Sequence, residues 1–298
     1  MRILLLGRNG QLGWELQRSL APLGEVVALG SSADEDGLCG DLCDLEGIAR
    51  TVDAVRPEAI VNAAAYTAVD KAESDADRAH TINALAPGVL AQAAHRIGAP
   101  LVHYSTDYVF DGSGERPWVE TDRTGPLSVY GRTKLEGEHR VAQAQPWHLV
   151  LRTSWVYGAR GGNFARTMLR LARERDRLTV IDDQFGAPTG ADLLADVTAH
   201  ALRALLADPA KAGTYHVAAA GETSWNGYAR FVVARAQQAG MELRAGVNAI
   251  DAVPTSAFPT PAQRPHNSRL DTTRLRATFG LHLPQWQQGV ARMLQEIS

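Results

Sequence analysis

The chain begins MRILLLGRNGQLGWELQRSL (residues 1–20), and this segment already indicates the class of fold. Residues 3–6 form a short continuous apolar run, which is typical of a strand buried on both faces. A glycine loop follows, and apolar residues then recur at helical spacing through Leu12, Leu16 and Leu20. Glycines between a strand and a helix allow a pyrophosphate to approach the helix N-terminus closely. The segment therefore predicts dinucleotide binding, although an ordinary glycine-rich turn would look the same locally.

Strand and helix signals alternate through the rest of the first half. The further strands are predicted at residues 26–29, 59–62, 101–105 and 149–153, with helices at 44–55, 76–97 and 129–144 between them. Such alternation implies parallel strands joined by right-handed crossovers, and their ligands bind at the carboxyl ends of the strands. We therefore predict an α/β protein built on a doubly wound parallel sheet.

The second half is less regular. Its helices are predicted at residues 163–175, 191–206, 225–239 and 285–295, its strands at 178–181 and 214–217, and a proline-rich loop at 254–265. We predict a cofactor-binding domain over residues 1–156, to which segments around 178–218 return. Residues 157–177 and 219–298 are expected to form mainly a smaller α/β substrate-binding lobe.

Composition excludes several classes of protein. The 298 residues carry a formal net charge of −3 and no basic block, which argues against nucleic acid as the main partner. No window approaches the ~18 apolar residues of a membrane span, and residues 1–6 do not resemble a signal peptide. Cys39 and Cys43 form neither a disulfide framework nor a complete metal site. We therefore expect a soluble cytoplasmic protein that has no membrane partner.

The end of the second predicted strand bears on the choice of cofactor. Sites that prefer NAD usually place an acidic residue there, whereas this chain reads Leu-Gly-Ser-Ser at residues 29–32. This neutral tip, with Arg8 available in the glycine loop, favours the 2′-phosphate of NADPH. NADH remains the alternative, because Asp34 or Asp36 could still reach the ribose. Asp41 could contact the adenine or simply cap a loop.

Acid–base chemistry is indicated by Tyr130 and Lys134, which lie one helical turn apart and would share a face. With seven tyrosines and three lysines in the chain, chance gives roughly 0.07 such pairs. A neighbouring ammonium would lower the pKa of the phenol, but a surface pair is the alternative. Thr106 ends the fourth strand, where its hydroxyl could hold a carbonyl oxygen or serve only as a turn residue.

These features resemble the extended short-chain dehydrogenase/reductases, with a Rossmann-type sheet, and Asn-Ala-Ala-Ala at residues 62–65 adds to the likeness. Longer blocks resemble the dTDP-4-dehydrorhamnose reductase family over essentially the whole chain. They are GQLG (10–13), AVDKAE (68–73), STDYVFDG (105–112), RTSWVY (152–157), QFGAPT (184–189), RP (264–265) and NSRL (267–270).

The resemblance implies an oxidoreductase that transfers hydride from NADPH to C4 of dTDP-4-dehydro-β-L-rhamnose (dTDP-6-deoxy-L-lyxo-4-hexulose). The product would be dTDP-L-rhamnose, for cell-surface polysaccharide such as lipopolysaccharide O-antigen. Tyr130 would be the general acid, Lys134 would tune it and bind the nicotinamide ribose, and Thr106 would orient the carbonyl.

The resemblance and the motifs together predict two sets of binding residues. For the cofactor they are Gly7, Arg8, Gly10, Gln11, Leu12, Gly13, Ser31, Asp41, Leu42, Ala63, Ala64, Ala65, Tyr104, Tyr130 and Lys134. For the nucleotide sugar they are Thr67, Val69, Thr106, Asp107, Trp155, Arg264, Asn267 and Ser268. Core packing is the alternative role for Trp155.

Some members of the family are dimers bridged by Mg²⁺, and the matching carboxylates here are Glu15, Asp192 and Glu296. Carboxylates suit Mg²⁺, but exposed helix residues are more simply solvated charges, and Asp stands where Glu is usual. The resemblance alone suggests a magnesium site and a homodimer, and solvated charges are the alternative for the three carboxylates.

Two other functions fit the same fold. One is another nucleotide-sugar epimerase, reductase or dehydratase, although a dehydratase would place an acidic pair after the threonine, and Tyr108 follows Asp107 here. The other is a non-catalytic, NADP-binding regulatory subunit, which intact Thr106, Tyr130 and Lys134 disfavour.

Overall fold

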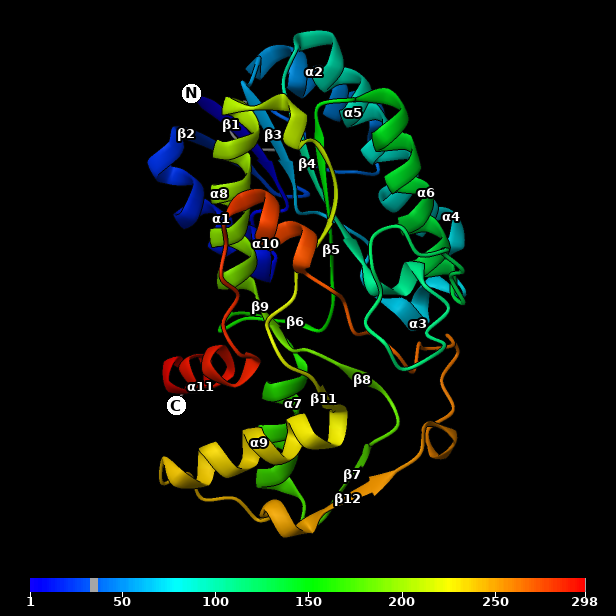
Figure 1. Ribbon diagram of the computed structural model, residues 1–298, viewed down its shortest axis with the longest axis vertical. Helices are drawn as coiled ribbons and strands as arrows, with labels where there is room; N and C mark the ends of the chain where they lie inside the picture. The colour runs from blue at the N-terminus through cyan, green and yellow to red at the C-terminus, as the bar shows by residue number, and fades with distance from the viewer. Residues whose placement is uncertain (33–36, 298) are drawn as a thin grey trace.

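The computed structural model describes residues 1–32 and 37–297. Its main feature is a sheet of six parallel strands in the spatial order β10-β5-β4-β3-β1-β2 (Figure 1). The strands are β1 Arg2–Leu6, β2 Glu25–Leu29, β3 Ala59–Asn62, β4 Leu101–Thr106, β5 His148–Thr153 and β10 Gly213–His216. The strand order reverses between β1 and β3, which is where such sheets bind their ligands. The predicted doubly wound α/β fold is confirmed.

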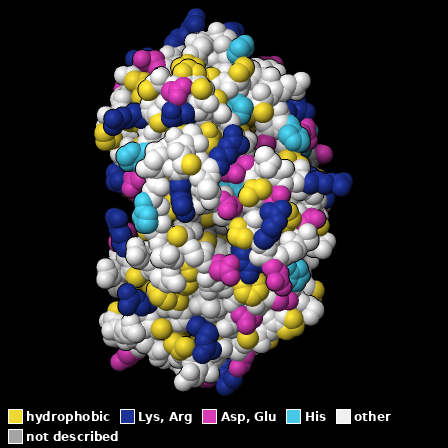
Figure 2. Space-filling model, in the orientation of Figure 1, with side chains coloured by type: hydrophobic (Ala, Val, Ile, Leu, Met, Phe, Trp, Pro, Cys, Tyr) yellow, Lys and Arg dark blue, Asp and Glu magenta, His cyan; other side chains and the backbone are white. Residues whose placement is uncertain are grey.

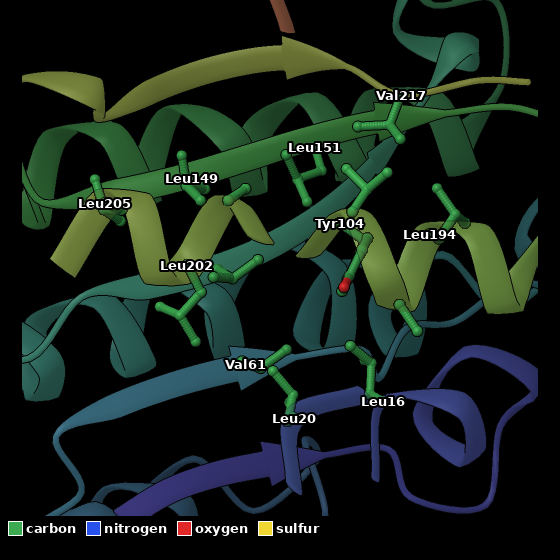
Figure 3. Packing of buried hydrophobic residues seen from close by; sticks show 14 of the residues in the cluster. Leu16, Leu20, Val61, Tyr104, Leu149, Leu151, Leu194, Leu202, Leu205 and Val217 are labelled. Carbon is green, nitrogen blue, oxygen red and sulfur yellow. The ribbon is translucent and has the colours of Figure 1, made fainter. Parts of the chain in front are cut away.

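Helices cover both faces of this sheet. One face carries α1 (Gln11–Leu20), α8 (Ala191–Ala207) and α10 (Thr273–Phe279), and the other carries α2 (Leu45–Val55), α5 (Ala86–Ile97) and α6 (Val129–Ala144). Successive strand residues alternate between these two faces. Leu5 and Val61 pack under α1 and α8 (Figure 3), whereas Leu4 and Ile60 pack under α2 and α5. Burial on both faces is why these strands read as continuous apolar runs.

Local signals place the helix ends. Asp44 accepts a hydrogen bond from Gly47 N at 2.7 Å and caps α2, as the sequence predicts. The first helix ends at Leu20, because Pro22 has no N–H to continue it. The chain continues there as a 3₁₀ turn, η1 (Ala21–Leu23).

The single helix predicted over residues 76–97 is three pieces in the structure. They are α4 (Ala76–His80), a π-helical turn η2 (Thr81–Leu85) and α5, preceded by the short helix α3 (Val69–Ala72). The π turn orients the buried Asn83, whose amide bonds both N and O of Tyr66. Long-range bonding therefore interrupts a helix that the local pattern favours as continuous.

A second hydrophobic cluster forms the lower part of the molecule in Figure 1. Its helices are α7 (Phe164–Glu174), α9 (Trp225–Gln238) and α11 (Trp286–Glu296). Its short strand pairs are β7 (Leu178–Ile181) with β12 (Ile250–Val253), β8 (Phe185–Gly186) with β11 (Thr223–Ser224), and β6 (Val156–Tyr157) with β9 (Thr189–Gly190). Short 3₁₀ turns complete the chain at η3 (Asp107–Val109), η4 (Pro209–Lys211), η5 (Val247–Ala249) and η6 (Thr255–Ala257).

The structure differs from the predicted interleaving at two segments. β7 was expected among the segments that return to the main sheet, but it pairs with β12 instead. α10, expected in the smaller lobe, packs through Leu275 into the core under the main sheet. Both are short amphipathic segments whose local pattern does not specify a partner. The division into two domains, with its boundaries, stays a prediction.

Figure 2 shows Lys and Arg side chains interspersed with Asp and Glu over one face of the molecule. Among the described residues, no helix is long and apolar enough to span a membrane.

Candidate active site

The glycine loop between β1 and α1 lies against the end of β3. Gly7 has a φ of +92°, and a Cβ there would lie 2.7 Å from Ala64 N. A Cβ on Gly13 would overlap the carbonyl oxygen of Gly7. Gly10 is the N-cap of α1, and no described side chain caps the helix there. The loop thus presents close-packed backbone and helix N–H groups, which is the arrangement that binds a pyrophosphate.

Arg8 extends from this loop along the end of β2. Its Nη1 donates to Ala28 O at 3.2 Å, and its side chain lies beside Gly30. The Arg8 guanidinium thus lies at the end of β2, where the sequence has no acidic residue between Leu29 and Ser32. Asp34 and Asp36, the alternative contacts, lie outside the described residues.

Other predicted cofactor residues take different places. Asp41 Oδ1 accepts from Cys43 N at 2.9 Å, so its carboxylate caps a loop, and Leu42 is buried in the core. Gln11 Oε1 accepts from Asn163 Nδ2 at 3.1 Å and so joins the loop to the start of α7. The Tyr104 side chain points toward α8, where its hydroxyl lies 2.5 Å from Thr198 Oγ1 (Figure 3). Only the backbone of Tyr104 therefore faces α6, the helix that carries Tyr130 and Lys134.

Tyr130 and Lys134 share one face of α6, whose N-terminus is capped by Ser128. Tyr130 forms a side-chain hydrogen bond with Thr106 and makes an edge contact with Tyr108, with ring centroids 5.5 Å apart. Burial raises the pKa of Tyr130, while the Thr106 hydrogen bond opposes the rise. The phenol therefore keeps its proton at neutral pH, which is the state a proton donor needs.

Lys134 is buried and extends into the sheet. Its Nζ donates to Tyr104 O at 2.6 Å and lies 3.3 Å from His103 Nε2. Burial lowers the pKa of Lys134 to about 8, while the Glu138 carboxylate opposes this shift. The sequence predicted that the Lys134 ammonium lowers the pKa of Tyr130. In the structure Lys134 Nζ contacts β4 and burial is the largest influence on the pKa of Tyr130, so the effect of Lys134 on Tyr130 stays a prediction.

Asp107 lies beside Thr106 at the end of β4 and is only 2% exposed. It accepts from Thr106 Oγ1 at 3.0 Å, and the Ser268 side chain lies close to its carboxyl group. Burial raises the pKa of Asp107 to about 6.

Several buried polar atoms at this edge of the sheet lack a hydrogen-bond partner among the described residues. They are Ser105 Oγ, Asp107 Oδ2, Thr153 Oγ1 and Ser154 Oγ. Buried polar groups are normally satisfied, so their grouping at the ends of β4 and β5 indicates a site for a polar ligand. From the sequence, Ser105 and Ser154 could be placed at the carboxyl ends of predicted strands but not assigned a role, and Thr153 was missed, although a hydroxyl residue that ends a predicted buried strand is a usable signal.

The predicted substrate residues come together only in part. Arg264 Nη2 pairs with Asp70 at 2.8 Å, and its Nη1 lies 3.4 Å from the Tyr108 hydroxyl. Ser268 reaches Asp107, which brings the 264–268 segment to the end of β4. Thr67 is exposed in the loop before α3, which begins at Val69.

Trp155 and Asn267 have structural partners. Trp155 has a positive φ of 50° and stacks on Trp225 with ring centroids 3.7 Å apart. Such a backbone is costly for a bulky residue, so tertiary packing must hold it. The Asn267 amide donates to the carbonyl oxygens of Ser113 and Arg116. These bonds anchor the backbone and occupy the amide that was predicted to face the nucleotide.

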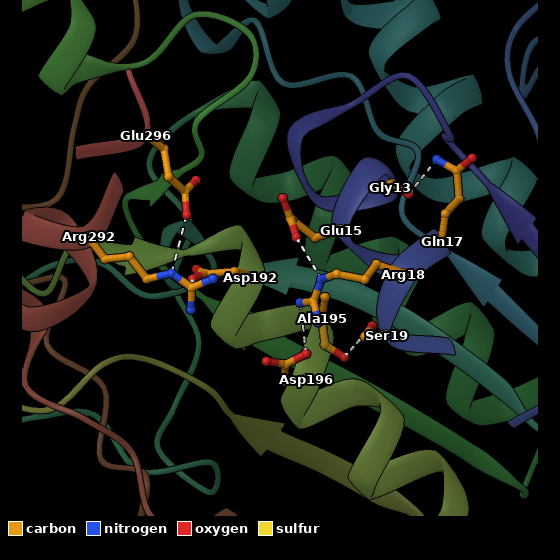
Figure 4. Close-up of polar contacts among 10 residues, drawn as sticks. All are labelled: Gly13, Glu15, Gln17, Arg18, Ser19, Asp192, Ala195, Asp196, Arg292 and Glu296. Atoms are coloured by element: carbon orange, nitrogen blue, oxygen red, sulfur yellow. Dashed lines mark hydrogen bonds and ion pairs between the residues drawn. The ribbon is translucent and has the colours of Figure 1, made fainter. Parts of the chain in front are cut away.

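The three predicted magnesium ligands do not form a metal site. Each carboxylate pairs with an arginine: Glu15 with Arg18, and both Asp192 and Glu296 with Arg292 (Figure 4). No group of three or more metal-binding side chains occurs among the described residues. Each of these carboxylates thus has an arginine partner in the chain, and the expected magnesium site is not supported.

A doubly wound parallel sheet, a glycine loop after β1, and a Tyr–Lys pair beside the end of β4 define a Rossmann-type short-chain dehydrogenase/reductase. The model of the RmlD substrate binding domain matches residues 1–298, and the chain belongs to this family.

Named relatives match along the full length. A dTDP-4-dehydrorhamnose reductase of Escherichia coli (strain K12) is 56% identical over 297 residues, covering 100% of this chain and 98% of that one. The crystal structure of a dTDP-4-dehydrorhamnose reductase from Clostridium acetobutylicum has a TM-score of 0.89 and 36% identity, with 99% of each chain covered. One from Bacillus anthracis, in complex with NADP, has a TM-score of 0.88 and 33% identity, again with 99% of each chain covered.

Proposed function

We propose that this chain is an NADPH-dependent oxidoreductase that reduces the C4 keto group of dTDP-4-dehydro-β-L-rhamnose. The product is dTDP-L-rhamnose, and the reaction is the last step of dTDP-rhamnose biosynthesis for cell-surface polysaccharide. The observation that carries the proposal is 56% identity, over the whole chain, to a dTDP-4-dehydrorhamnose reductase.

Reduction requires a proton donor beside the carbonyl oxygen. We assign that role to Tyr130, which is protonated at neutral pH and hydrogen-bonded to Thr106. When bound, NADPH supplies the hydride that adds to C4. The Tyr130 hydroxyl gives its proton to the developing alkoxide, and the Thr106 hydroxyl orients the same oxygen. Lys134 stabilises the phenolate that is left and binds the nicotinamide ribose.

The cofactor assignment rests on the glycine loop and on Arg8. The N-terminus of α1 would bind the pyrophosphate, and Arg8 at the end of β2 would bind the 2′-phosphate. The NADP complex of the Bacillus anthracis relative supports NADPH. NADH is the alternative cofactor.

The sugar nucleotide would lie across the carboxyl ends of β4 and β5. Asp107 and Ser268 are the proposed sugar contacts, together with Trp155. Arg264 suits the diphosphate, because a guanidinium binds phosphate oxygens in pairs. It pairs with Asp70 in the structure, so the substrate would compete with a carboxylate that is partly exposed.

Cytoplasmic location and a homodimer belong to the proposal through the family resemblance. Magnesium has no part in it, because Glu15, Asp192 and Glu296 each pair with arginine.

The proposal is tested by supplying the purified chain with the dTDP-4-keto-6-deoxy-L-hexulose and either NADPH or NADH. Oxidation of the reduced nicotinamide is followed by absorbance, and the sugar product by chromatography. We expect turnover with NADPH, and Tyr130→Phe should lower kcat by about 10²–10⁴-fold because it removes the proton donor. The Kd for NADPH should stay within about twofold, since the cofactor loop is unchanged.

Other outcomes favour the alternatives. NADPH binding without turnover would favour a regulatory subunit, and a different sugar product would favour another nucleotide-sugar enzyme. Near-normal activity of Tyr130→Phe would remove Tyr130 as the acid.

A further inference from the structure

Three buried polar side chains from three elements form a chain of contacts behind the catalytic face of α6. Asn62 ends β3, His103 lies in β4, and Lys134 comes from α6. Asn62 Nδ2 lies 3.2 Å from His103 Nδ1, and His103 Nε2 lies 3.3 Å from Lys134 Nζ. The three residues are 1%, 1% and 2% exposed. Groups so well shielded must satisfy one another.

The orientation of the Asn62 amide decides which imidazole nitrogen carries the proton. Asn62 Oδ1 accepts from Ala64 N at 3.2 Å, so its NH₂ group faces His103 Nδ1. Nδ1 must then be the acceptor. Burial, and next the Lys134 charge, hold the pKa of His103 well below its usual value, so the ring is neutral. A neutral imidazole has one N–H, and here that N–H is on Nε2.

The His103 Nε2–H therefore points at Lys134 Nζ. An ammonium has three donors and no acceptor, so it would meet this N–H as a second donor. An amine can accept from Nε2–H and still donate to Tyr104 O, which lies 2.6 Å away. The contact thus favours the amine form of Lys134 and opposes its ammonium form.

Two other groups near Lys134 favour its ammonium form, and the effect of one of them is reduced by an ion pair. On α6, the Glu138 carboxylate favours the ammonium, as does Tyr104 O on β4. Glu138 is itself paired with Arg152 of β5 at 2.6 Å, which neutralises much of its effect. Tyr130, on α6, and Asp107, after β4, interact with each other rather than with Lys134. Burial is the largest cause of the lowered Lys134 pKa, and of the two groups in contact with Nζ only the imidazole can change the position of its proton.

We propose that His103, oriented by Asn62, is a positioning residue that fixes Lys134 Nζ and favours its amine form. This rests on the role proposed above for Lys134. The consequence is that the charge beside the reaction changes within the working pH range. Because the role proposed above for Lys134 depends on its charge, the pH profile of kcat should depend on His103.

The composition makes a direct test possible, because Lys71, Lys134 and Lys211 are the only lysines in the chain. Protein labelled with lysine carrying ¹³C at Cε would give three resonances, and Lys134→Arg would identify the one from Lys134. In the unsubstituted chain we expect the Lys134 resonance to titrate at least one pH unit below the ordinary lysine value of about 10.4. Titration of Lys134 at that ordinary value would overturn the proposal without any variant of His103.

His103→Gln should raise the titration midpoint of Lys134 by about one pH unit or more. The glutamine amide can turn its oxygen toward Nζ and accept from the ammonium. Asn62→Ala is a second variant that should also raise the Lys134 midpoint. Without the Asn62 amide, the His103 ring can move its proton to Nδ1 and accept from the Lys134 ammonium at Nε2. An unchanged midpoint in a folded variant of either kind would overturn the proposal.

His148→Gln is the matched control. His148 is also buried in a strand, but its Nδ1 contacts Gln145 O and not Lys134. It should leave the Lys134 midpoint unchanged.

The titration needs neither substrate nor turnover, so it can be read even if the proposed reductase activity fails. In an active enzyme, His103→Gln should move the pH profile of kcat in the same direction as the Lys134 midpoint. The KM for the sugar should change little, because His103 lies behind Lys134 and the substrate residues contact other groups. A fall in kcat at every pH with no shift of the profile would mean that His103 is merely structural.

Discussion

At the scale of single residues, burial rather than charge pairing dominates the chemistry of the site. Asp107 shows this most clearly, because it is a carboxyl with one oxygen bonded to Thr106 and the other without a described partner. Removing a carboxylate from water disfavours its charged form, and the pKa rises to about 6. The ends of buried strands thus supply polar groups that can hydrogen-bond a ligand.

A pH dependence of stability follows from this raised pKa. The folded chain holds a proton on Asp107 that the unfolded chain releases near pH 4. Its stabilising contribution is therefore present below pH 4 and is lost as pH rises through about 6. Above that, the buried charge costs up to about 3 kcal/mol. Asp107→Asn should raise the free energy of unfolding at pH 8 by about 1–3 kcal/mol and change it little at pH 4, as urea titrations would show.

The control is Asp111→Asn. Hydrogen bonds from Ser113 lower the pKa of this exposed carboxyl, so removing its charge should bring no gain at pH 8. An equal rise in the free energy of unfolding at pH 8 in both variants would mean that the change in net charge is the cause. No rise for Asp107→Asn would mean that burial does not destabilise the charged form of Asp107.

At the scale of elements, the position of α6 depends on close contact with the π turn before α5. Asn83 in that turn donates to Thr133 Oγ1 on α6 at 3.2 Å, and its backbone lies against Gly137. An ideal Cβ on Gly137 would overlap the carbonyl oxygen of Asn83. The glycine thus permits the approach that places Tyr130 and Lys134 beside β4.

Gly137→Ala should lower the free energy of unfolding by about 1–3 kcal/mol, because a backbone carbonyl cannot yield as a side chain can. It should also lower kcat, since α6 carries both proposed catalytic side chains. Thermal unfolding and the reductase assay would measure the two effects.

Gly88→Ala is the matched helical control on α5. A Cβ there would lie 3.3 Å from Arg140 Cβ, with the rest of that flexible side chain nearby. Alanine also has the higher helix propensity, so the stability should change by less than about 1 kcal/mol. Similar losses in both variants would show that the α6 contact has no special role.

At the scale of the whole molecule, residues 266–271 connect β8 to the loop after β4 through backbone hydrogen bonds. Asn267 is central to this segment, because its N donates to Gly112 O and its O accepts from Trp118 Nε1. Its side chain adds bonds to the carbonyl oxygens of Ser113 and Arg116. The segment therefore holds Ser268 against Asp107 and ties the site to the loop after β4.

Asn267→Ala should lower the free energy of unfolding by about 2–4 kcal/mol, because it leaves two carbonyl groups without their amide donor. The KM for the sugar should rise as Ser268 loses its support. Asn248→Ala, at an exposed asparagine, should be neutral. If Asn267→Ala changes the KM for the sugar but not the free energy of unfolding, Asn267 contacts the nucleotide as predicted from the sequence and has no structural role.

Much of this fold could be predicted locally. The strands at β1, β3 and β4, the cap at Asp44 and the glycine loop all follow from neighbouring residues. The partner of β7 and the π turn at residues 81–85 could not be predicted, because each depends on residues far away in the chain. For the same reason the bonds from the Asn267 amide to two distant carbonyl groups could not be predicted, and its contact with the nucleotide stays a prediction.

The sequence by itself determined the alternation of strands and helices and the spacing that puts Tyr130 and Lys134 on one face. Both follow from backbone periodicity, which acts over a few residues. Only the tertiary structure decided which groups those side chains contact. It turned Lys134 toward His103, raised the pKa of Asp107 by burial and paired the expected metal ligands with arginines. Burial and partner choice depend on contacts between distant segments, and no local pattern of residues encodes them.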